Sequence, residues 1–389
     1  MWAERMAKRT NLLESSVIRE LLKLTAKKEM ISFAGGLPGP ETFPVNEFKE
    51  ASDKVLRDSG TQALQYTITE GYPPLREFIA SYLSKKGIKC SAKNILLTNG
   101  SQQALDLIAK VMCDPDDYIL LEEPSYLGAI QAFTAYETKF ATIPIDKNGT
   151  VTDLLEEKIK KYNPKFIYLL PNFHNPAGIT MSLERRKKVI EIANKTGSLI
   201  IEDDPYGDLR YTGESLSPIK ALDVNDNVIY LGTFSKILSP GVRIGWIVAP
   251  DNIMIKLVEA KQGADLCSSP FIHMVVDELC KNNILETQLP KIKKIYGERC
   301  KLMLDSIEKY FPSGSDWTKP EGGLFIWAQL QDKYNTKELF NKAIEKNVAY
   351  VPGFCFYANG GGESTMRLNF SNAQNDMIEV GIKRLSEIF

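Results

Sequence analysis

A lysine between two apolar runs is the residue whose position most directly suggests chemistry. Lys236 lies in LGTFSKILSPGVRIGW, after VIYLG and before RIGWIVA, and Arg243 follows it by seven residues. Burial between strands lowers the pKa of an amine, because it disfavours the charged form. Such a lysine can act as a nucleophile and as a base near neutral pH.

Two other apolar runs end in residues that could bind parts of one ligand. ILLT is followed by Gly100 and Ser101 at the start of a helix pattern, and the free N–H groups of a helix N-terminus can bind phosphate. LIIED ends with Asp203, and a carboxylate directly after a buried run requires a cationic partner. Each feature also has an ordinary structural cause, because serine is a common helix cap and loop acids are often only solvated.

The three strand ends together are satisfied by a single ligand. It must carry a phosphate, a group that pairs with an acid, and an electrophile for an amine. Pyridoxal phosphate has all three, in its phosphate, its ring nitrogen and its aldehyde. We therefore expect pyridoxal 5'-phosphate as the cofactor. The two histidines, His174 and His273, lie far apart in sequence, so we expect neither a metal site nor a histidine-based triad.

Seven short apolar runs must position these residues. Helix-like stretches or loops separate them, and the runs are ILLT, YILLE, FATIPI, FIYLL, LIIED, VIYLG and RIGWIVA. Runs that are apolar throughout are typical of buried, mostly parallel strands, whose carboxyl ends bind ligands. After about residue 285 a long charged helix pattern precedes GLFIWAQL, VAYVPG and TMRLNF.

These patterns predict an α/β fold in two unequal parts. The large domain has a mostly parallel seven-stranded sheet covered by helices, and a smaller α+β domain is built from both chain ends. The predicted boundaries are 1–45 for an N-terminal arm and part of the small domain, 46–284 for the large cofactor-binding domain, and 285–389 for the small C-terminal domain.

Composition excludes several classes of partner. The 389 residues carry a formal net charge of -1, which gives no reason to expect nucleic acid. No apolar stretch approaches the roughly 18 residues of a membrane span, and the start, MWAERMAKRT, lacks a signal-peptide pattern. The six cysteines are scattered and are expected to be reduced thiols in a cytoplasmic protein.

Four motifs in one order carry a family resemblance. GSQQAL, PNFHNPAG, EDDPYGDLRY and GTFSKILSPGVRIGW resemble those of the fold-type I, class I/II aminotransferases that use pyridoxal phosphate. The chain is most similar to the branch of 2-aminoadipate, kynurenine and broad-specificity archaeal aminotransferases, from ISFAGGLP to TMRLNF. The resemblance implies transamination between an L-amino acid and a 2-oxo acid by a ping-pong mechanism. Glutamate and 2-oxoglutarate are the expected first pair, and 2-aminoadipate, an aromatic amino acid, kynurenine or a branched-chain amino acid belongs to the second.

The resemblance also implies a role for each motif residue. Three are expected to be catalytic: Lys236, which bonds to the cofactor and moves the proton, Asp203, which keeps the ring nitrogen protonated, and Tyr206, which bonds the ring hydroxyl. The other expected cofactor contacts are Asn175, Tyr126, Ser101, Gln102, Ser235 and Arg243, with Thr233 a weaker candidate. Tyr66 would reach the phosphate of a neighbouring subunit, so the resemblance implies a homodimer with shared sites. Arg367 would bind the substrate α-carboxylate, with Gly36 and Asn175 beside it.

The same residues could also have purely structural roles, or serve a different reaction. The tyrosines could be core aromatics, Arg243 and Arg367 could form structural ion pairs, and Asn175 could cap a turn before proline. A β-lyase or decarboxylase would use the same cofactor and lysine. A transcription regulator with this domain would add a DNA-binding domain, and only about 30 residues precede AGGLP. A nucleotide-dependent oxidoreductase is disfavoured because no G-x-G-x-x-G follows a strand.

Arg19 is the candidate for substrate selection. It lies in SSVIRELLKL, where helical spacing turns Val17, Leu21 and Leu24 inward and Arg19 away from them. In the family that the chain resembles, the N-terminal helix covers the substrate pocket. A mobile arginine there could bind the distal carboxylate of an acidic substrate and swing out for an apolar one. The alternative is an exposed surface arginine. His174, beside the NPAG motif, is expected to pack or to donate a hydrogen bond.

Overall fold

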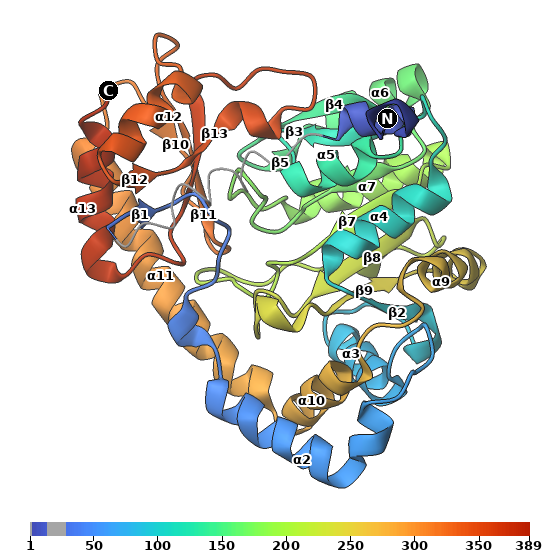
Figure 1. Ribbon diagram of the computed structural model, residues 1–389. Coiled ribbons are helices and arrows are strands. Elements are labelled where there is room, and N and C mark those ends of the chain that lie inside the picture. Colours follow the sequence, from blue (N-terminus) through green and yellow to red (C-terminus); the bar gives the residue numbers. More distant parts are fainter. Residues whose placement is uncertain (1, 14–28) are drawn as a thin grey trace.

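The computed structural model describes residues 2–13 and 29–389 of the chain. Figure 1 shows a large helix-covered sheet on one side, a smaller sheet with the C-terminal helices on the other, and a group of helices below both. The long helix α11 (Ile284–Tyr310) runs from that lower group to the smaller sheet.

The large sheet carries the residues singled out from the sequence. Its strand order is β2 (Ile95–Thr98), β9 (Gly245–Val248), β8 (Val228–Thr233), β7 (Ile200–Asp203), β6 (Ile167–Leu169), β3 (Tyr118–Glu123), β4 (Lys139–Asp146) and β5 (Gly149–Thr150). The prediction of seven strands is one short, because the chain turns after β4 and adds the two-residue β5 antiparallel to it. The α/β class and the mostly parallel sheet are confirmed.

Besides the short edge strand β5, the strand β9 inside the sheet is reversed. β9 pairs antiparallel with both β2 and β8, whereas β8, β7, β6, β3 and β4 pair in parallel. A strand that returns directly beside its predecessor keeps their connection at one edge of the sheet. The loop 234–244 therefore stays at the edge where the parallel strands end.

The two faces of the large sheet are covered by different helices. Side chains alternate along each strand, so Ile119 and Leu121 join one part of the core and Leu120 the other. The first face packs against α4 (Ser101–Met112), α5 (Leu127–Thr134) and α9 (Asp251–Asp265). The second packs against α6 (Leu155–Tyr162), α7 (Leu183–Thr196) and α8 (Ile219–Leu222). Both faces are thus buried, as the continuous apolar runs predicted.

The remaining elements join the two ends of the chain. β10 (Asp316–Trp317), β11 (Phe325–Gln329), β14 (Thr365–Asn369) and β13 (Val351–Pro352) form an antiparallel sheet. β1 (Ile31–Ser32) pairs in parallel with β12 (Val348–Ala349), which ties the start of the chain to its end. Helices α12 (Thr336–Glu345) and α13 (Asn375–Ser386) belong to the same region. We propose that 1–45 supply an N-terminal arm and part of the small domain, that 285–389 supply the rest of the small domain, and that 46–284 form the large one.

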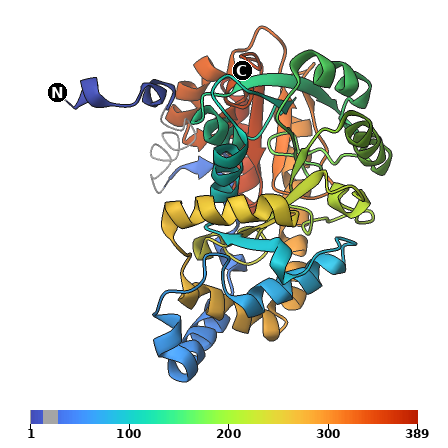
Figure 2. The same ribbon diagram turned by 90° about the vertical axis from the view of Figure 1, so that its right-hand side faces the viewer.

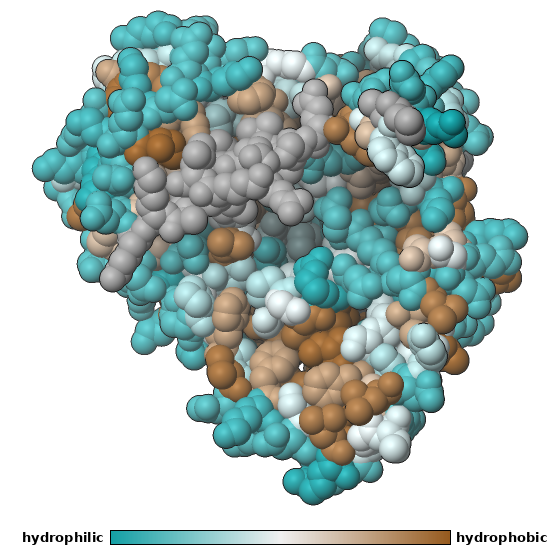
Figure 3. Space-filling model, viewed as in Figure 1, coloured by the Kyte–Doolittle hydropathy of each residue, from teal (hydrophilic) through white to brown (hydrophobic). Residues whose placement is uncertain are grey.

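The lower group of helices and the chain start present hydrophobic surface. The group consists of α2 (Val45–Ala63), α3 (Pro73–Ser84) and α10 (Pro270–Lys281), and hydrophobic side chains gather on this part of the face in Figure 3. The loop after α2 exposes Leu64 and Tyr66, at 75% and 76% of their surface. The 3-10 turns Ala3–Arg5 and Lys8–Leu12 extend away from the body of the molecule in Figure 2. Within the described ranges, no helix combines the length and apolarity that a membrane crossing requires.

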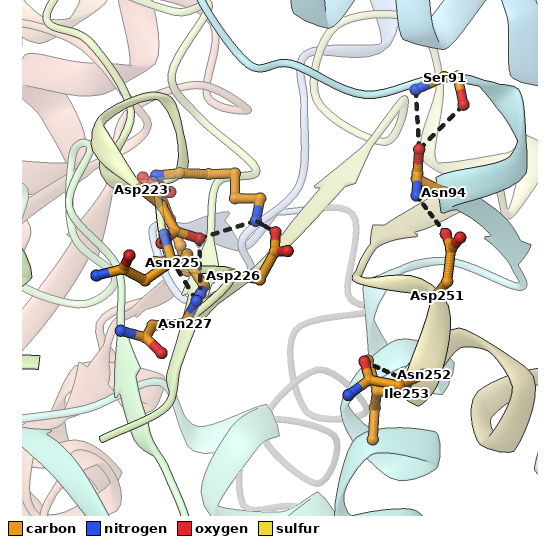
Figure 4. A network of polar contacts seen from close by, with 12 residues as sticks. Ser91, Asn94, Asp223, Asn225, Asp226, Asn227, Asp251, Asn252 and Ile253 are labelled. Atoms are coloured by element: carbon orange, nitrogen blue, oxygen red, sulfur yellow. Dashed lines mark hydrogen bonds and ion pairs between the residues drawn. The ribbon is translucent and has the colours of Figure 1, made fainter. Parts of the chain in front are cut away.

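A polar network holds the turn between α8 and β8. The buried Asp223 carboxylate accepts hydrogen bonds from Lys220 Nζ at 2.9 Å and from the backbone N–H groups of Asn225, Asn227 and Val228 at 3.0 to 3.2 Å (Figure 4). These bonds hold the pKa of Asp223 below its usual range, although burial alone would raise it. The network fixes the turn that starts β8, the strand that leads to Lys236.

Asp223→Ala should destabilise the protein by about 2–4 kcal/mol, because it removes the close carboxylate partner of the buried Lys220 amine and the acceptor of three backbone N–H groups. Asp226 is the matched control, since its exposed carboxylate lies 3.8 Å from the same amine. Asp226 has a left-handed backbone with φ of 58°, which asparagine tolerates, so Asp226→Asn removes the charge without backbone strain and should change stability by less than about 0.5 kcal/mol. Urea denaturation measures both, and equal small effects would contradict the structural role of Asp223.

Candidate active site

A pocket opens at the edge where the parallel strands end. Its volume is about 260 Å³. Its lining residues are Gly36, Leu37, Ser101, Gln102, Tyr126, Leu170, Asn175, Asp203, Pro205, Tyr206, Thr233, Ser235, Lys236, Pro240, Arg243 and Arg367. Of the predicted site residues that the structure describes, all but Tyr66 are in this set. The strands bring them together as the sheet topology requires, since ligands bind beyond the carboxyl ends of such strands.

One end of the pocket has the character of an anion site. Ser101 begins α4, and its buried Oγ has no hydrogen-bond partner within the described part of the chain. Arg243, in a left-handed conformation with φ of 52°, donates to Asn99 O at 3.2 Å and to Pro240 O at 3.3 Å. Gly100 has φ of 76°, and a Cβ there would collide with the Arg243 guanidinium. Glycine therefore lets the arginine lie against the start of the helix.

Asp265, at the end of α9, holds the residues that form this anion-binding end of the pocket. Its carboxylate accepts from Asn99 Nδ2 and Gln103 Nε2, both at 2.7 Å, and from Lys261 Nζ at 2.8 Å. Gln103 Oε1 in turn accepts from the backbone N–H of Asn99 at 2.7 Å. The first turn of α4 is thus held by bonds to a second helix, which orients its N–H groups and Ser101 towards the pocket.

The middle of the pocket holds a cation and an acid. Lys236 Nζ donates to Gly36 O at 2.8 Å, and burial, Arg367 and Arg243 together lower the pKa of its amine to about 8. Asp203 is 2% exposed, and burial raises its pKa to about 7. Its Oδ2 accepts from the Tyr168 hydroxyl at 2.7 Å, whereas its buried Oδ1 has no partner among the described residues.

The other end of the pocket is built around Arg367 on β14. Its guanidinium donates to Asn175 Oδ1 at 2.8 Å and to Ala34 O at 2.7 Å, and lies 4.3 Å from the Phe325 ring centre. Burial lowers the pKa of Arg367 to about 10, so the group stays a cation at neutral pH. Asn175 Nδ2 donates to the Tyr206 hydroxyl at 3.3 Å, which links the two expected ring contacts.

The remaining expected residues differ in their place relative to the pocket. Tyr126 lines the pocket. Thr233 Oγ1 donates to Ile244 O at 2.9 Å and lies within hydrogen-bond distance of Ser235 Oγ, also 2.9 Å away, which orients Ser235. Tyr66 is exposed and lies outside the lining of this chain's own pocket. Arg19 lies outside the described residues, so its role stays a prediction.

The residues present fit pyridoxal phosphate. Three buried polar atoms in the pocket have no protein partner in residues 2–13 and 29–389: Ser101 Oγ, Asp203 Oδ1 and Arg367 Nε. A buried polar atom without a partner costs free energy, so these atoms indicate a bound polar ligand. A hydroxyl beside an arginine suits a phosphate, and a carboxylate oxygen suits a protonated ring nitrogen.

Sequence reasoning missed the residues that support the pocket from behind. Tyr168 lies within the apolar run FIYLL and Asp265 lies near the end of a helix, and the sequence analysis singled out neither. Their partners are distant in sequence, so no local signal identified them. His174 Nδ1 accepts from the N–H of Ala177 at 3.3 Å, and its Nε2 lies 3.4 Å from Glu122 Oε2. The histidine thus braces the turn that carries Asn175.

Comparison with known proteins decides the family. The family model described as aminotransferase class I and II matches residues 28–385. The chain belongs to this family. The aminotransferase is 47% identical to aromatic-amino-acid aminotransferase 1 of Thermococcus litoralis, over 96% of this chain and 91% of that protein. The resemblance predicted from the four motifs is confirmed.

Two solved structures extend the similarity to the whole fold. The aminotransferase matches the kynurenine aminotransferase of Pyrococcus horikoshii with a TM-score of 0.95 and 45% identity, over 99% of this chain and 97% of that one. It matches the alpha-aminoadipate aminotransferase of Thermus thermophilus with a TM-score of 0.94 and 41% identity, over 100% and 98% of the chains. The first structure contains PMP with kynurenine, and the second contains N-(5'-phosphopyridoxyl)-L-leucine.

The lowered pKa of Lys236 predicts selective reactivity in the cofactor-free protein. At pH 8 roughly half of its amine should be neutral, against well under about 1% for a lysine with an ordinary pKa near 10.4. An amine-reactive reagent should therefore modify Lys236 before the surface lysines, with a rate that rises through pH 8 and levels off above about pH 9. Peptide mass spectrometry across a pH series measures this order. Modification of Lys236 only together with the surface lysines would contradict the electrostatic description of the pocket.

Proposed function

We propose that this aminotransferase exchanges amino groups between glutamate or 2-oxoglutarate and a second amino acid or 2-oxo acid by a ping-pong mechanism. The second pair is drawn from aromatic amino acids, kynurenine, 2-aminoadipate and branched-chain amino acids. The observation that carries the proposal is a lysine amine with a pKa of about 8 in one pocket with a buried aspartate and two arginines.

Pyridoxal phosphate is the cofactor of this family, and the pocket offers a group for each part of it. Ser101, Gln102, Ser235 and Arg243 would hold the phosphate, with Thr233 orienting Ser235. Asp203 would bind the ring nitrogen through Oδ1. Tyr206 and Asn175 would bind the ring hydroxyl, and Tyr126 would pack on the ring.

When bound, the cofactor supplies an electron sink that acidifies the α-hydrogen of an amino acid. Lys236 would take the proton from the substrate α-carbon, since a pKa of about 8 leaves part of its amine neutral at physiological pH. Arg367, with Asn175 on one of its nitrogens, would bind the α-carboxylate and fix the α-carbon within reach of Lys236. Gly36, whose carbonyl accepts from Lys236, would close the same side of the pocket.

The end of the pocket around Arg367 has apolar groups beside the cation. Leu37 lines the pocket, and the rings of Phe325 and Phe356 pack against the Arg367 guanidinium, with ring centres 4.3 and 5.0 Å from its carbon. Among the described lining residues the cations are Lys236, Arg243 and Arg367, and each has a role in the proposal. A distal carboxylate then needs another cation, which we propose is Arg19. The names of the aromatic, kynurenine and aminoadipate relatives support a site that accepts both substrate classes.

We propose a homodimer with shared sites. Tyr66 and its neighbour Leu64 are more than 70% exposed, and Ile68 and Leu266 expose nearly half of their surface. A tyrosine that is exposed beside apolar residues is typical of an interface. The hydroxyl of Tyr66 would reach the phosphate bound by the other subunit. The cytoplasmic location predicted from the scattered cysteines stays a prediction, and all six are free thiols.

A substrate panel tests the proposed activity. With pyridoxal phosphate and 2-oxoglutarate, the protein should convert aromatic amino acids, kynurenine, 2-aminoadipate or leucine to their 2-oxo acids and form glutamate. Lys236→Ala should abolish this turnover while circular dichroism stays unchanged, because the amine that moves the proton is gone. Initial rates should give parallel double-reciprocal lines. Release of carbon dioxide or pyruvate without glutamate would indicate a lyase or decarboxylase instead.

The same panel tests Arg19. Arg19→Ala should lower kcat/KM for glutamate and 2-aminoadipate by about tenfold or more, the effect of losing a charged hydrogen bond. Leucine and phenylalanine should be nearly unaffected. Equal losses of kcat/KM for both substrate classes, or no loss for the acidic substrates, would indicate that Arg19 is a surface residue without a role in substrate selection.

Subunit mixing tests the shared site. Tyr66→Phe should weaken cofactor retention by about 1–2 kcal/mol, for one hydrogen bond to a charged group. A heterodimer of Tyr66→Phe and Lys236→Ala subunits contains one site with both native residues, and should recover wild-type retention at that site. A fully active monomer in sedimentation would contradict the dimer, and no recovery on mixing would contradict the contact across subunits.

A further inference from the structure

Two buried tyrosines flank β7 and bond to two successive acids at its end. Tyr168, on β6, donates to Asp203 Oδ2 at 2.7 Å. Tyr230, on β8, donates to Asp204 Oδ2 at 2.9 Å. Both side chains are at most 1% exposed. Tyr168 therefore binds Asp203, which lines the pocket, and Tyr230 binds Asp204, which does not.

The register of the sheet assigns each tyrosine to its acid. Tyr168 pairs with Ile201, two residues before Asp203, so it lies on the same face of the sheet as Asp203. Tyr230 pairs with Glu202, two residues before Asp204, so it lies on the opposite face. The hydroxyl of Tyr168 is thereby directed at Asp203 by backbone pairing rather than by a flexible loop.

The two oxygens of Asp203 have different partners. Oδ2 accepts a hydrogen bond from Tyr168. The buried Oδ1 has no partner among the described residues, and Asp203 lines the pocket. A carboxylate held at one oxygen cannot rotate without losing that bond. The bond from Tyr168 thus directs Oδ1 towards the ligand.

We propose that Tyr168 is a positioning residue that keeps Asp203 ionised and aims its free oxygen at the ring nitrogen of the cofactor. The inference rests on the proposed function, because it requires pyridoxal phosphate in this pocket. A hydroxyl donates a stronger hydrogen bond to a charged carboxylate than to a neutral carboxyl group, so the Tyr168 bond favours the charged form. An ionised Asp203 pairs with a protonated ring nitrogen, which is the state that withdraws electrons.

The electrostatics of the site explain why such support is needed. Burial raises the pKa of Asp203 to about 7, the Tyr168 bond opposes that rise, and Asp204 adds to it. Without the hydroxyl, Asp203 would hold its own proton more readily. It would then lose its advantage in binding a protonated nitrogen over a neutral group.

The test compares two cofactors on the full-length protein stripped of its cofactor and reconstituted. One is pyridoxal phosphate, and the other is its deaza analogue, in which the ring nitrogen is replaced by C–H. Both have the same aldehyde and phosphate. Equilibrium dialysis or fluorescence titration gives a dissociation constant for each. The ratio of the two constants reports the contact with the ring nitrogen.

Wild-type protein should bind the natural cofactor more tightly than the analogue, and Tyr168→Phe should reduce this preference by about tenfold or more. Tyr230→Phe is the matched control, since it removes an equally buried hydroxyl from a neighbouring strand. Its preference should equal that of the wild type. Equal weakening of both cofactors by Tyr168→Phe would overturn the inference, because it would show a general structural effect.

Repeating the comparison in an Asp203→Asn variant separates the effect on Asp203 from a general loss of stability. In Asp203→Asn, further removal of the Tyr168 hydroxyl should leave the preference unchanged, because no carboxylate remains to be held. A continued loss in that background would overturn the inference. Failure of the wild type to bind pyridoxal phosphate at all would instead overturn the proposed function, so the two failures are distinguishable.

Discussion

Three basic side chains share one small pocket with one buried carboxylate, and their burial, reinforced by their mutual repulsion, governs the chemistry of the site. Among the described lining residues, these are Lys236, Arg243, Arg367 and Asp203. In a buried pocket like charges interact more strongly than in water. The two arginines therefore add to the effect of burial on the pKa of Lys236. The same excess of positive charge favours dianionic and carboxylate ligands, and those ligands in turn relieve the repulsion.

A pocket with this charge requires a rigid frame. Arg186, which is fully buried, donates to Pro171 O and Met181 O at 3.0 and 2.9 Å, and so holds both ends of the loop that carries Asn175. Asp265 holds the first turn of α4 from the other side. Each of these groups is satisfied by several hydrogen bonds, which offsets the cost of burying its charge. The pocket residues are thus held by polar groups behind the pocket, of which Arg186 is fully buried and Asp265 partly buried.

The frame also explains why the chain ends matter to the site. Arg367 comes from β14 near the C-terminus, yet it donates to Ala34 near the start of the chain. β1 and β12 pair across a similar distance in sequence. One side of the pocket is therefore closed only when both ends of the chain meet, and substrate binding by Arg367 depends on that closure.

The motif residues and their chemistry follow from the sequence, because strand ends, glycines and charged residues leave local signals. The α/β class, the family and the cofactor were all predicted from runs such as LIIED and VIYLG and from the motifs that follow them. The reversed direction of β9 left no such signal, because an apolar run is compatible with either a parallel or an antiparallel strand. Tyr168 and Asp265 were also missed, because their hydrogen-bond partners lie 35 and 162 residues away and such distant pairs leave no local pattern in the sequence. The types of residue in the pocket were thus determined by the sequence, and their support was decided only by the pairing of strands and helices that the tertiary fold brings together.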